Sequence, residues 1–286
     1  TITKALACAG RIESVFEVNS GMADGSVKEV TAKEEQSAVE FKNVSLTYSG
    51  SGAPSVEGIN FKAMKGQTIG VIGGTGSGKS SLVNLIPRLY DATQGEVLVD
   101  GVNVKDYDIE TLRNKVGIVM QKAVLFKGTI RENMWMGKKG ATDEQIDEAL
   151  EISQSKEFVD SKQGRLDYVI EQGGKNLSGG QRQRLTIARA IVRKPDVLIL
   201  DDSASALDFA TDAALRKAIR GMNNSPSVFI VSQRAASLIY ADLIIVLDDG
   251  QVAGMGTHDE LLANCEVYKE IYESQFKKAD SEGGVA

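Results

Sequence analysis

The amino-acid sequence predicts an α/β fold: a mostly parallel sheet flanked by helices, with an N-terminal antiparallel β subdomain and an inserted α-helical subdomain. Three observations carry this prediction. Short apolar strands alternate with helical stretches in the C-terminal part of the chain, as in a parallel sheet wrapped by helices. A glycine-rich loop follows one apolar strand and opens a helix. A mainly helical stretch at about residues 122–184 interrupts the alternation.

The composition is that of an ordinary globular protein. The 286 residues are 42% hydrophobic and 25% charged, and no stretch approaches the roughly 20 apolar residues of a membrane helix. A net charge of −6 argues against nucleic acid as a partner, because a broad nucleic-acid footprint needs a basic surface. The two cysteines, Cys8 and Cys265, lie far apart and indicate reduced thiols. Any mechanism that needs an imidazole must use His258, the single histidine.

The first 38 residues predict a helix and a linker. Apolar residues recur at helical spacing over residues 1–18, which indicates an amphipathic helix. This helix either packs on its own domain or connects to a neighbouring domain, and the pattern favours neither. Residues 19–37 are polar and contain glycine, as a linker does.

Strands are predicted next. They are residues 39–48, 59–64, 67–72, 96–99 and 116–120. The second and third are joined by a turn at Lys65-Gly66, and the fourth leads into Asp100-Gly101, a hairpin signal.

Helices then predominate until strands return near the C-terminus. The stretch 142–193 is mostly helical, with one helix over 143–152 and another opening near Ser178. The later strands are residues 197–200, 228–232 and 243–247, and Asp249-Gly250 predicts a hairpin turn. The later helices are residues 208–220, 234–240, 259–263 and 267–276. Residues 278–286 predict a disordered tail.

The glycine-rich loop directly follows the strand over 67–72. It consists of Gly73, Gly74, Thr75, Gly76, Ser77, Gly78, Lys79 and Ser80, and Ser81 continues into the helix. The glycines let backbone N–H groups point at the β-phosphate of a nucleotide. Lys79 can then reach the β- and γ-phosphate oxygens, and the Ser80 hydroxyl can bind Mg²⁺. The loop therefore predicts a P-loop core that binds a nucleoside triphosphate.

A second element of this core is acidic. The apolar segment 197–200 ends in Asp201-Asp202, and a carboxylate at the end of a buried strand can reach Mg²⁺ beside Ser80. Asp201 is therefore predicted as a metal ligand.

A third element lies about 100 residues beyond the loop, at residues 177–184, Leu-Ser-Gly-Gly-Gln-Arg-Gln-Arg. Ser178, Gly179, Gly180 and Gln181 predict a helix N-terminus whose free N–H groups and dipole favour an anion. The glycine loop already supplies a phosphate-binding site within the chain. We therefore expect this helix start to bind the phosphates of a nucleotide held by another subunit.

This octapeptide closely resembles the signature of ATP-binding cassette (ABC) proteins. From about residue 39 to 276 the chain resembles the nucleotide-binding domain of an ABC transporter, and residues 121–133 resemble the exporter class in particular. The resemblance implies a P-loop ATPase with ATP and Mg²⁺ as cofactors. It implies that Tyr48 stacks on adenine and that Gln121 contacts Mg²⁺ and senses the transmembrane domain.

The resemblance also implies contacts with other domains. Glu171 would face the loops of the membrane domain, and Asp208, at the end of residues 205–208, would lie in the loop that communicates across a dimer. Residues 1–38 would be a linker with the cytoplasmic end of a transmembrane domain outside the chain, and residues 39–277 the ABC domain. The expected location is the cytoplasmic face of the cell membrane.

Two positions depart from the family pattern. The usual glutamate base after the strand-end aspartate is Asp202, which is one methylene shorter, and the usual switch histidine is Gln233, which cannot carry a positive charge. A displacement of order 1 Å at a reacting group can cost ~10²-fold in rate. His258 is no substitute, because its context predicts a capped helix start.

The resemblance therefore implies a chain with an impaired site and an intact signature. Asp202, Gln233 and Gln121 are its expected catalytic residues. The chain is similar to the subunit of a heterodimeric exporter that lends Ser178–Gln181 to a partner with a competent ATP site. Two alternatives are an ATP-operated clamp or regulator without hydrolysis, and a soluble cassette protein of DNA repair or translation. The acidic charge and the single cassette disfavour the second alternative.

Overall fold

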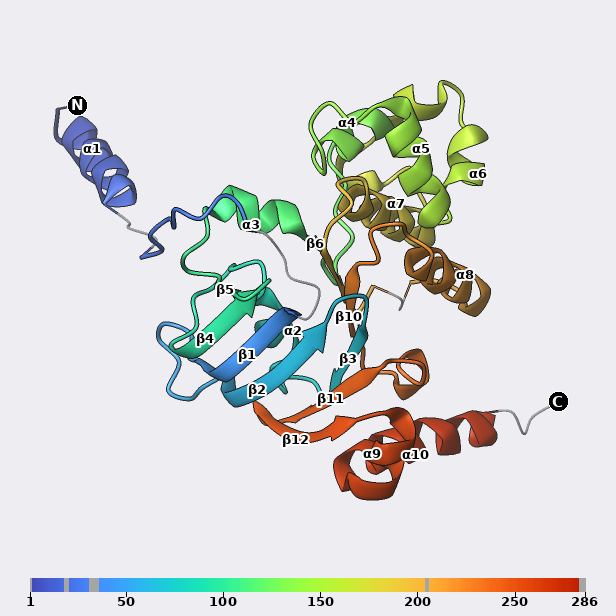
Figure 1. The fold of residues 1–286 in the computed structure, drawn as a ribbon. Coiled ribbons are helices and arrows are strands. Elements are labelled where there is room, and N and C mark those ends of the chain that lie inside the picture. Colours follow the sequence, from blue (N-terminus) through green and yellow to red (C-terminus); the bar gives the residue numbers. More distant parts are fainter. Residues whose placement is uncertain (1, 18–20, 31–35, 204–205, 283–286) are drawn as a thin grey trace.

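The structure is a computed structural model that describes residues 2–17, 21–30, 36–203 and 206–282. Helix α1 (Ile2–Phe16) forms where the apolar spacing predicted it. Its side chains from residue 3 onward are exposed and it lies apart from the sheets in Figure 1, so this helix does not pack on the domain that follows. None of the helices described is long and apolar enough to cross a membrane.

The described part of the predicted linker is not purely a spacer. Val27 pairs with Tyr107 in an isolated parallel bridge, and the Gly25 N–H donates to the Tyr107 carbonyl at 3.0 Å. The linker therefore runs along the edge of the domain at this point.

A mostly parallel sheet forms the centre of the domain (Figure 1). Among the described residues its strand order is β12-β11-β3-β10-β9-β6, and β12 alone runs antiparallel. The strands are β3 (Thr68–Gly73), β6 (Val116–Val119), β9 (Val197–Asp201), β10 (Ser227–Val231), β11 (Leu243–Asp248) and β12 (Gln251–Gly256). Every residue of β3, β9 and β10 is buried, as expected of central strands covered on both faces. Val231 pairs with Val71 and with Asp201, so the carboxyl ends of these three strands meet at one edge.

The predicted antiparallel subdomain is confirmed. Its order is β2-β1-β4-β5, from β1 (Ser37–Leu46), β2 (Val56–Met64), β4 (Gln94–Val99) and β5 (Val102–Asn103). The ring of Phe61 stacks on Phe41 at 4.5 Å and lies 6.3 Å from Phe229 of β10, so aromatic contacts join the two sheets. The turn at Lys65-Gly66 joins β2 to β3 as predicted, but the two strands belong to different sheets.

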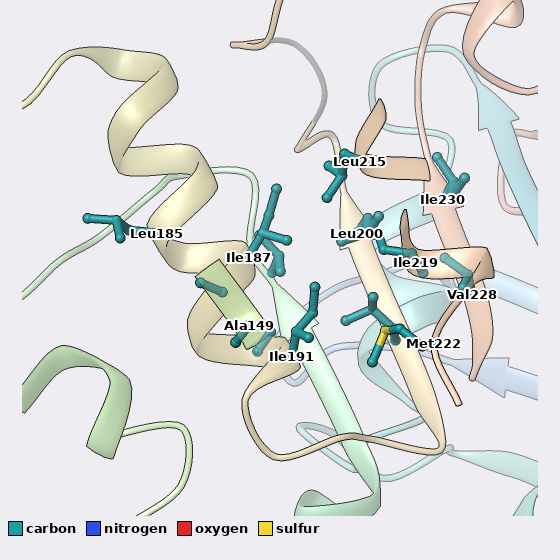
Figure 2. Packing of buried hydrophobic residues seen from close by; sticks show 14 of the residues in the cluster. Ala149, Leu185, Ile187, Ile191, Leu200, Leu215, Ile219, Met222, Val228 and Ile230 are labelled. Atoms are coloured by element: carbon teal, nitrogen blue, oxygen red, sulfur yellow. The ribbon is translucent and has the colours of Figure 1, made fainter. Parts of the chain in front are cut away.

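The helical subdomain forms a separate lobe, in green and yellow in Figure 1. It contains α4 (Ile130–Trp135), α5 (Asp143–Ile152), α6 (Lys156–Asp160), the short β7 (Gly128–Thr129) and β8 (Val169–Ile170), the 3₁₀ turns Arg165–Asp167 and Gln172–Gly174, and α7 (Gly179–Ile191). Figure 2 shows Ile187 and Ile191 on the side of α7 that faces the strands, in one buried cluster with Leu200 of β9. This packing attaches the lobe to the central sheet.

The remaining helices surround the sheets. They are α2 (Lys79–Asn84), α3 (Ile109–Lys115), α8 (Phe209–Arg220), α9 (His258–Asn264) and α10 (Glu266–Glu282). The helix predicted over 234–240 is wrong: only a 3₁₀ turn, η3 (Ala235–Ser237), forms before the chain returns to β11. Helix α10 continues to Glu282, through a segment without glycine or proline, and so includes the first residues of the predicted tail. Residues 283–286 of the predicted tail lie outside the described residues.

Candidate nucleotide-binding site

A pocket of about 270 Å³ lies at the edge where β3, β9 and β10 end. It gathers residues from five regions of the chain. These residues are Ser55, Thr75, Gly76, Gly78, Lys79, Ser80, Ser81, Gln121, Asp201, Asp202, Val231, Ser232 and Gln233. The structure therefore brings together the glycine loop, the strand-end carboxylates and both departures from the family pattern.

The glycine loop has the conformation that its residue types predicted. Gly76 and Gly78 have φ values of 82° and 94°, in the left-handed region that favours glycine. A Cβ atom on Gly78 would stand 2.4 Å from the Ser55 carbonyl oxygen, and one on Gly73 would stand 2.2 Å from that of Leu247. The loop is thus closed against its neighbours on one side and leaves its other side to the pocket, which fits a phosphate cradle.

Lys79 lies buried at the start of α2 and points back into the loop. Its Nζ donates to the carbonyl oxygens of Gly73 at 2.9 Å and Gly74 at 2.5 Å. Burial lowers the pKa of Lys79, and the nearby charges of Asp201 and Asp202 oppose that shift. An ammonium group held in this way gains a strong partner when a phosphate enters.

The expected metal ligands Ser80 and Asp201 are adjacent. Asp201 is 5% exposed, and burial raises the pKa of its carboxyl group while a hydrogen bond from Ser80 lowers it. Among the described residues, no three His, Cys, Asp or Glu side chains are grouped so as to hold a metal ion. One carboxylate and one hydroxyl fit Mg²⁺, which is commonly bound by few protein ligands together with substrate phosphates. Bound Mg²⁺ would supply Lewis-acid stabilisation of phosphate charge.

The three expected catalytic residues face the same pocket. The Gln121 side-chain amide donates to the Asp202 carboxylate at 3.3 Å. Asp202 has a φ of 45°, in the left-handed region, and its N–H donates to the Val231 carbonyl at 2.9 Å. Gln233 is exposed just beyond the end of β10. A carboxylate, an amide donor and a second amide thus surround the space next to Lys79 and Ser80.

Tyr48 lies at the side of the site expected to receive adenine. Its hydroxyl donates to Ser81 Oγ at 3.0 Å, and its ring meets Tyr90 edge to face at 4.9 Å. The ring is half-buried, so part of its surface remains open to a base. The stacking role stays a prediction.

The signature residues lie outside the pocket. Ser178 caps α7: its side chain accepts from the Gln181 N–H at 3.2 Å, and the Gln181 side chain accepts from the Ser178 N–H at 3.1 Å. Asp208 caps α8 through the Thr211 N–H at 2.9 Å. Of the loop at residues 205–208, Ser205 lies outside the described residues. The sequence predicted these residues as nucleotide-binding, and none of them reaches the pocket of its own chain.

Ser55 and Ser232 line the pocket, and sequence reasoning missed them. Ser232 could have been found from its place between β10 and Gln233. No sequence motif marks Ser55, which comes close to the glycine loop only in the folded chain. His258 behaves as its context predicted: it follows the cap Thr257, and its Nδ1 lies 2.8 Å from the Tyr268 hydroxyl, away from the pocket.

The fold and the pocket are those of a P-loop nucleotide-binding domain, with the glycine loop, Ser80 and Asp201 at one edge of a parallel sheet. The chain belongs to the ABC transporter family, whose ATP-binding domain matches residues 56–205. It is therefore an ABC-type ATPase domain that uses ATP and Mg²⁺.

Several relatives share most of this chain. YfiB of Bacillus subtilis, an ABC transporter ATP-binding protein, is 41% identical over 281 residues, which are 98% of this chain and 48% of YfiB. The ABC transporter ATP-binding protein Rv1273c of Mycobacterium tuberculosis is 39% identical over 287 residues, 99% of this chain and 49% of that protein. A solved structure of a bacterial Atm1-family ABC exporter with ATP bound has a TM-score of 0.88 and 29% identity, covering 96% of this chain and 48% of that one. The chain spans about half the length of the curated relatives it matches.

Proposed function

We propose that the chain is the nucleotide-binding domain of a heterodimeric ABC exporter, with a slow ATP site of its own and an intact signature that serves its partner. One observation carries the proposal: Asp202 and Gln233 stand in the pocket with Lys79 and Ser80, at the positions where ABC ATPases usually have a glutamate base and a histidine. Both residues line the pocket that we expect to hold the nucleotide, and both are less suited to hydrolysis than the usual glutamate and histidine.

The weakness has a physical cause at each position. A general base must come within hydrogen-bond reach of the attacking water, and Asp202 has one methylene less to do so. Its carboxylate also accepts the hydrogen bond from Gln121, which holds it toward the Gln121 side of the pocket. Gln233 can donate to a γ-phosphate oxygen but brings no charge to it. Binding through Lys79 and the glycine loop is independent of both residues.

The signature supports the second half of the proposal. Ser178 and Gln181 form a complete capping box, so the N-terminus of α7 is already shaped, yet it faces no phosphate pocket of its own chain. A helix start with free N–H groups suits an anion. A head-to-tail pair of such domains would place this N-terminus over the nucleotide of the other subunit.

The proposal that this chain works with a transmembrane domain is based on its relatives. The chain covers about half of each relative, and one of them, a Staphylococcus aureus protein named for multidrug export, is 38% identical over 240 residues. We infer that a transmembrane domain accompanies this chain, that α1 leads from it, and that the assembly works at the cytoplasmic face of the cell membrane. Drugs or lipid-like molecules are the expected cargo class.

Steady-state ATPase activity of the purified chain tests the proposal. We expect slow turnover with normal Mg²⁺-ATP binding, and an increase of about tenfold or more in the double variant Asp202→Glu with Gln233→His. Lys79→Ala, which removes binding, is the control. Turnover at the level of ordinary transport ATPases in the unaltered chain, or no gain in the double variant, would contradict the impaired-site assignment.

A clamp without hydrolysis is the second candidate, and the Gln121–Asp202 hydrogen bond favours it because it engages one oxygen of the carboxylate expected to act as the base. Incubation with Mg²⁺-ATP over hours distinguishes the two. Slow ADP release supports the enzyme, and fully intact ATP supports the clamp.

A further inference from the structure

The C-terminal helix α10 touches the loop that carries Gln233, and this contact lies outside every motif of the sequence. The Gln275 side chain makes two hydrogen bonds to that loop. Its Nε2 donates to the Gln233 carbonyl at 2.7 Å, and its Oε1 accepts from the Ala235 N–H at 2.9 Å. One amide therefore joins the backbone on both sides of Arg234.

The helix that carries Gln275 is firmly anchored. Tyr268 is fully buried, its hydroxyl lies 2.8 Å from His258 Nδ1, and the rings of Tyr268 and Tyr272 pack on His258 at 5.8 and 5.2 Å. Tyr268, Tyr272 and Gln275 are spaced by four and three residues, so they lie along one face of α10. The face of α10 that packs on His258 is therefore also the face that carries the Gln275 side chain.

Local hydrogen bonds also hold this loop, because the Arg234 and Ala235 carbonyls accept from the Ser237 and Leu238 N–H groups at 3.1 and 2.9 Å. The Arg234 N–H donates to Ser232 Oγ at 2.9 Å, and Gln233 and Arg234 are exposed. Ala235 is fully buried, so its N–H would lack a partner without Gln275, which is costly for a buried donor. Gln275, 42 residues away in the sequence, adds two hydrogen bonds to the backbone that carries Gln233 into the pocket.

We propose that Gln275 is a positioning residue for the ATP site: it holds the backbone of residues 233–235 so that the Gln233 side chain meets the γ-phosphate. The inference rests on the proposed function, since it concerns the same nucleotide. It extends the site to the C-terminal helix and makes recognition of the γ-phosphate depend on the docking of α10. ADP lacks that phosphate, so its binding is independent of Gln275.

The contact is tested first without nucleotide. Gln275→Ala should speed hydrogen exchange of the Ala235 amide by about fivefold or more, because its acceptor is lost. Amides of β10 should keep their protection. The matched control is Ser274→Ala, whose exposed hydroxyl donates to the Ile271 carbonyl within α10. Unchanged exchange at Ala235 in the Gln275 variant would overturn the contact.

The role is tested by nucleotide preference. With Mg²⁺ present and a fluorescent nucleotide displaced, Gln275→Ala should lower the ratio of ATP to ADP affinity by about three- to tenfold and leave ADP affinity unchanged. Gln233→Ala should lower the ratio at least as much, and the double variant should lose no more than Gln233→Ala alone. Gln275→Glu, which keeps an acceptor for Ala235 but sets a carboxylate against the Gln233 carbonyl, should shift the ratio in the same direction.

The outcomes separate the two proposals. If the unaltered chain binds no Mg²⁺-ATP, the proposed function fails and the role of Gln275 toward phosphate fails with it. If the chain binds ATP normally and the ATP to ADP ratio is the same in Gln275→Ala, or the losses in the double variant simply add, the positioning role alone is overturned.

Discussion

The side-chain amide of Gln121 donates a hydrogen bond to the Asp202 carboxylate across 3.3 Å of the nucleotide pocket. The two residues come from different regions, Gln121 from just beyond β6 and Asp202 from just beyond β9. Strands β6 and β9 pair in parallel from Val116↔Val197 onward, so their carboxyl ends lie at the same edge of the central sheet. The two side chains therefore lie close together. Gln121, which family resemblance predicts to contact Mg²⁺ and the transmembrane domain, is thus hydrogen-bonded to the candidate base Asp202.

Replacement of this carboxylate by its amide tests its chemical role. Asp202→Asn keeps the size and an oxygen that can accept from Gln121, but it cannot take a proton from water. We expect residual ATP hydrolysis to fall by about 10²-fold, within the range for loss of a general base, while Mg²⁺-ATP affinity stays within about threefold. A radiolabelled ATPase assay and a binding titration measure both. Equal hydrolysis in the two proteins would exclude Asp202 as the base.

The glycine loop offers a matched pair of substitutions. Gly78→Ala places a Cβ 2.4 Å from the Ser55 carbonyl at a φ of 94°, whereas Gly74→Ala meets no atom within 4 Å and has no positive φ. We expect Gly78→Ala to lose about 2 kcal/mol or more of unfolding free energy, and Gly74→Ala to change it by less than about 0.5 kcal/mol. Urea denaturation followed by circular dichroism gives both values. A stable Gly78→Ala protein would mean that the loop adopts another conformation.

Asp201 makes stability depend on pH in a particular direction. Burial raises its pKa in the folded chain, so the folded state binds its proton more tightly than the unfolded state does. The contribution of Asp201 to the free energy of unfolding therefore falls as the pH rises. The fall begins at the pKa of the unfolded chain, about 3.9, and continues through the higher pKa of the folded chain. Without Mg²⁺, Asp201→Asn should show a higher Tm than the unaltered chain at pH 7, with a difference that shrinks toward pH 4. The same variant should bind Mg²⁺-ATP at least tenfold more weakly, by loss of a metal ligand. A lower Tm at pH 7 would show that the carboxylate is net stabilising.

A charged cluster joins the antiparallel sheet to the central sheet. Lys115 Nζ lies 2.8 Å from Asp100 and 2.9 Å from Asp196, and Asp100 is 3% exposed. Lys115→Met should destabilise the fold by about 2–3 kcal/mol, because it removes the cation nearest to the buried Asp100 carboxylate among the described residues and leaves Lys65 at 3.9 Å. The control Lys62→Met removes an exposed lysine from Glu40, which keeps Lys42 at 4.0 Å, and should cost less than about 1 kcal/mol. Chemical denaturation compares the two, and equal effects would refute a structural role for the cluster.

Much of this molecule was predictable because its signals are local. The left-handed glycines of the phosphate loop, the buried strand before Asp201 and the Ser178–Gln181 capping box all follow from residue types at short spacing. Alternation over residues 39–48 predicted a half-buried strand, and Val39, Phe41, Val44 and Leu46 of β1 belong to one core cluster. Such features need no knowledge of the rest of the chain.

The unpredicted features are those decided at long range. The turn at Lys65-Gly66 predicted that β2 and β3 follow each other in the chain, but not that they lie in different sheets: β3 is buried along its whole length and pairs with β10 and β11. Gln275 reaches Gln233 over 42 residues, and no periodicity reveals a polar residue that serves a distant backbone. Tyr48 and Gln121 were predicted by family resemblance, and only the fold shows which neighbours they touch.

The left-handed backbone at Asp202 has a consequence for any attempt to repair the site. Non-glycine residues with a φ of 45° are uncommon, and aspartate tolerates this region better than most because its short side chain interacts with the nearby backbone. Glutamate lacks that advantage, so lengthening the side chain tightens the turn after β9 while it extends the reach of the acid. A substitution that speeds ATP hydrolysis at this position is therefore expected to add backbone strain. A variant with Asp202→Glu that gains activity should unfold at a slightly lower temperature than the unaltered chain.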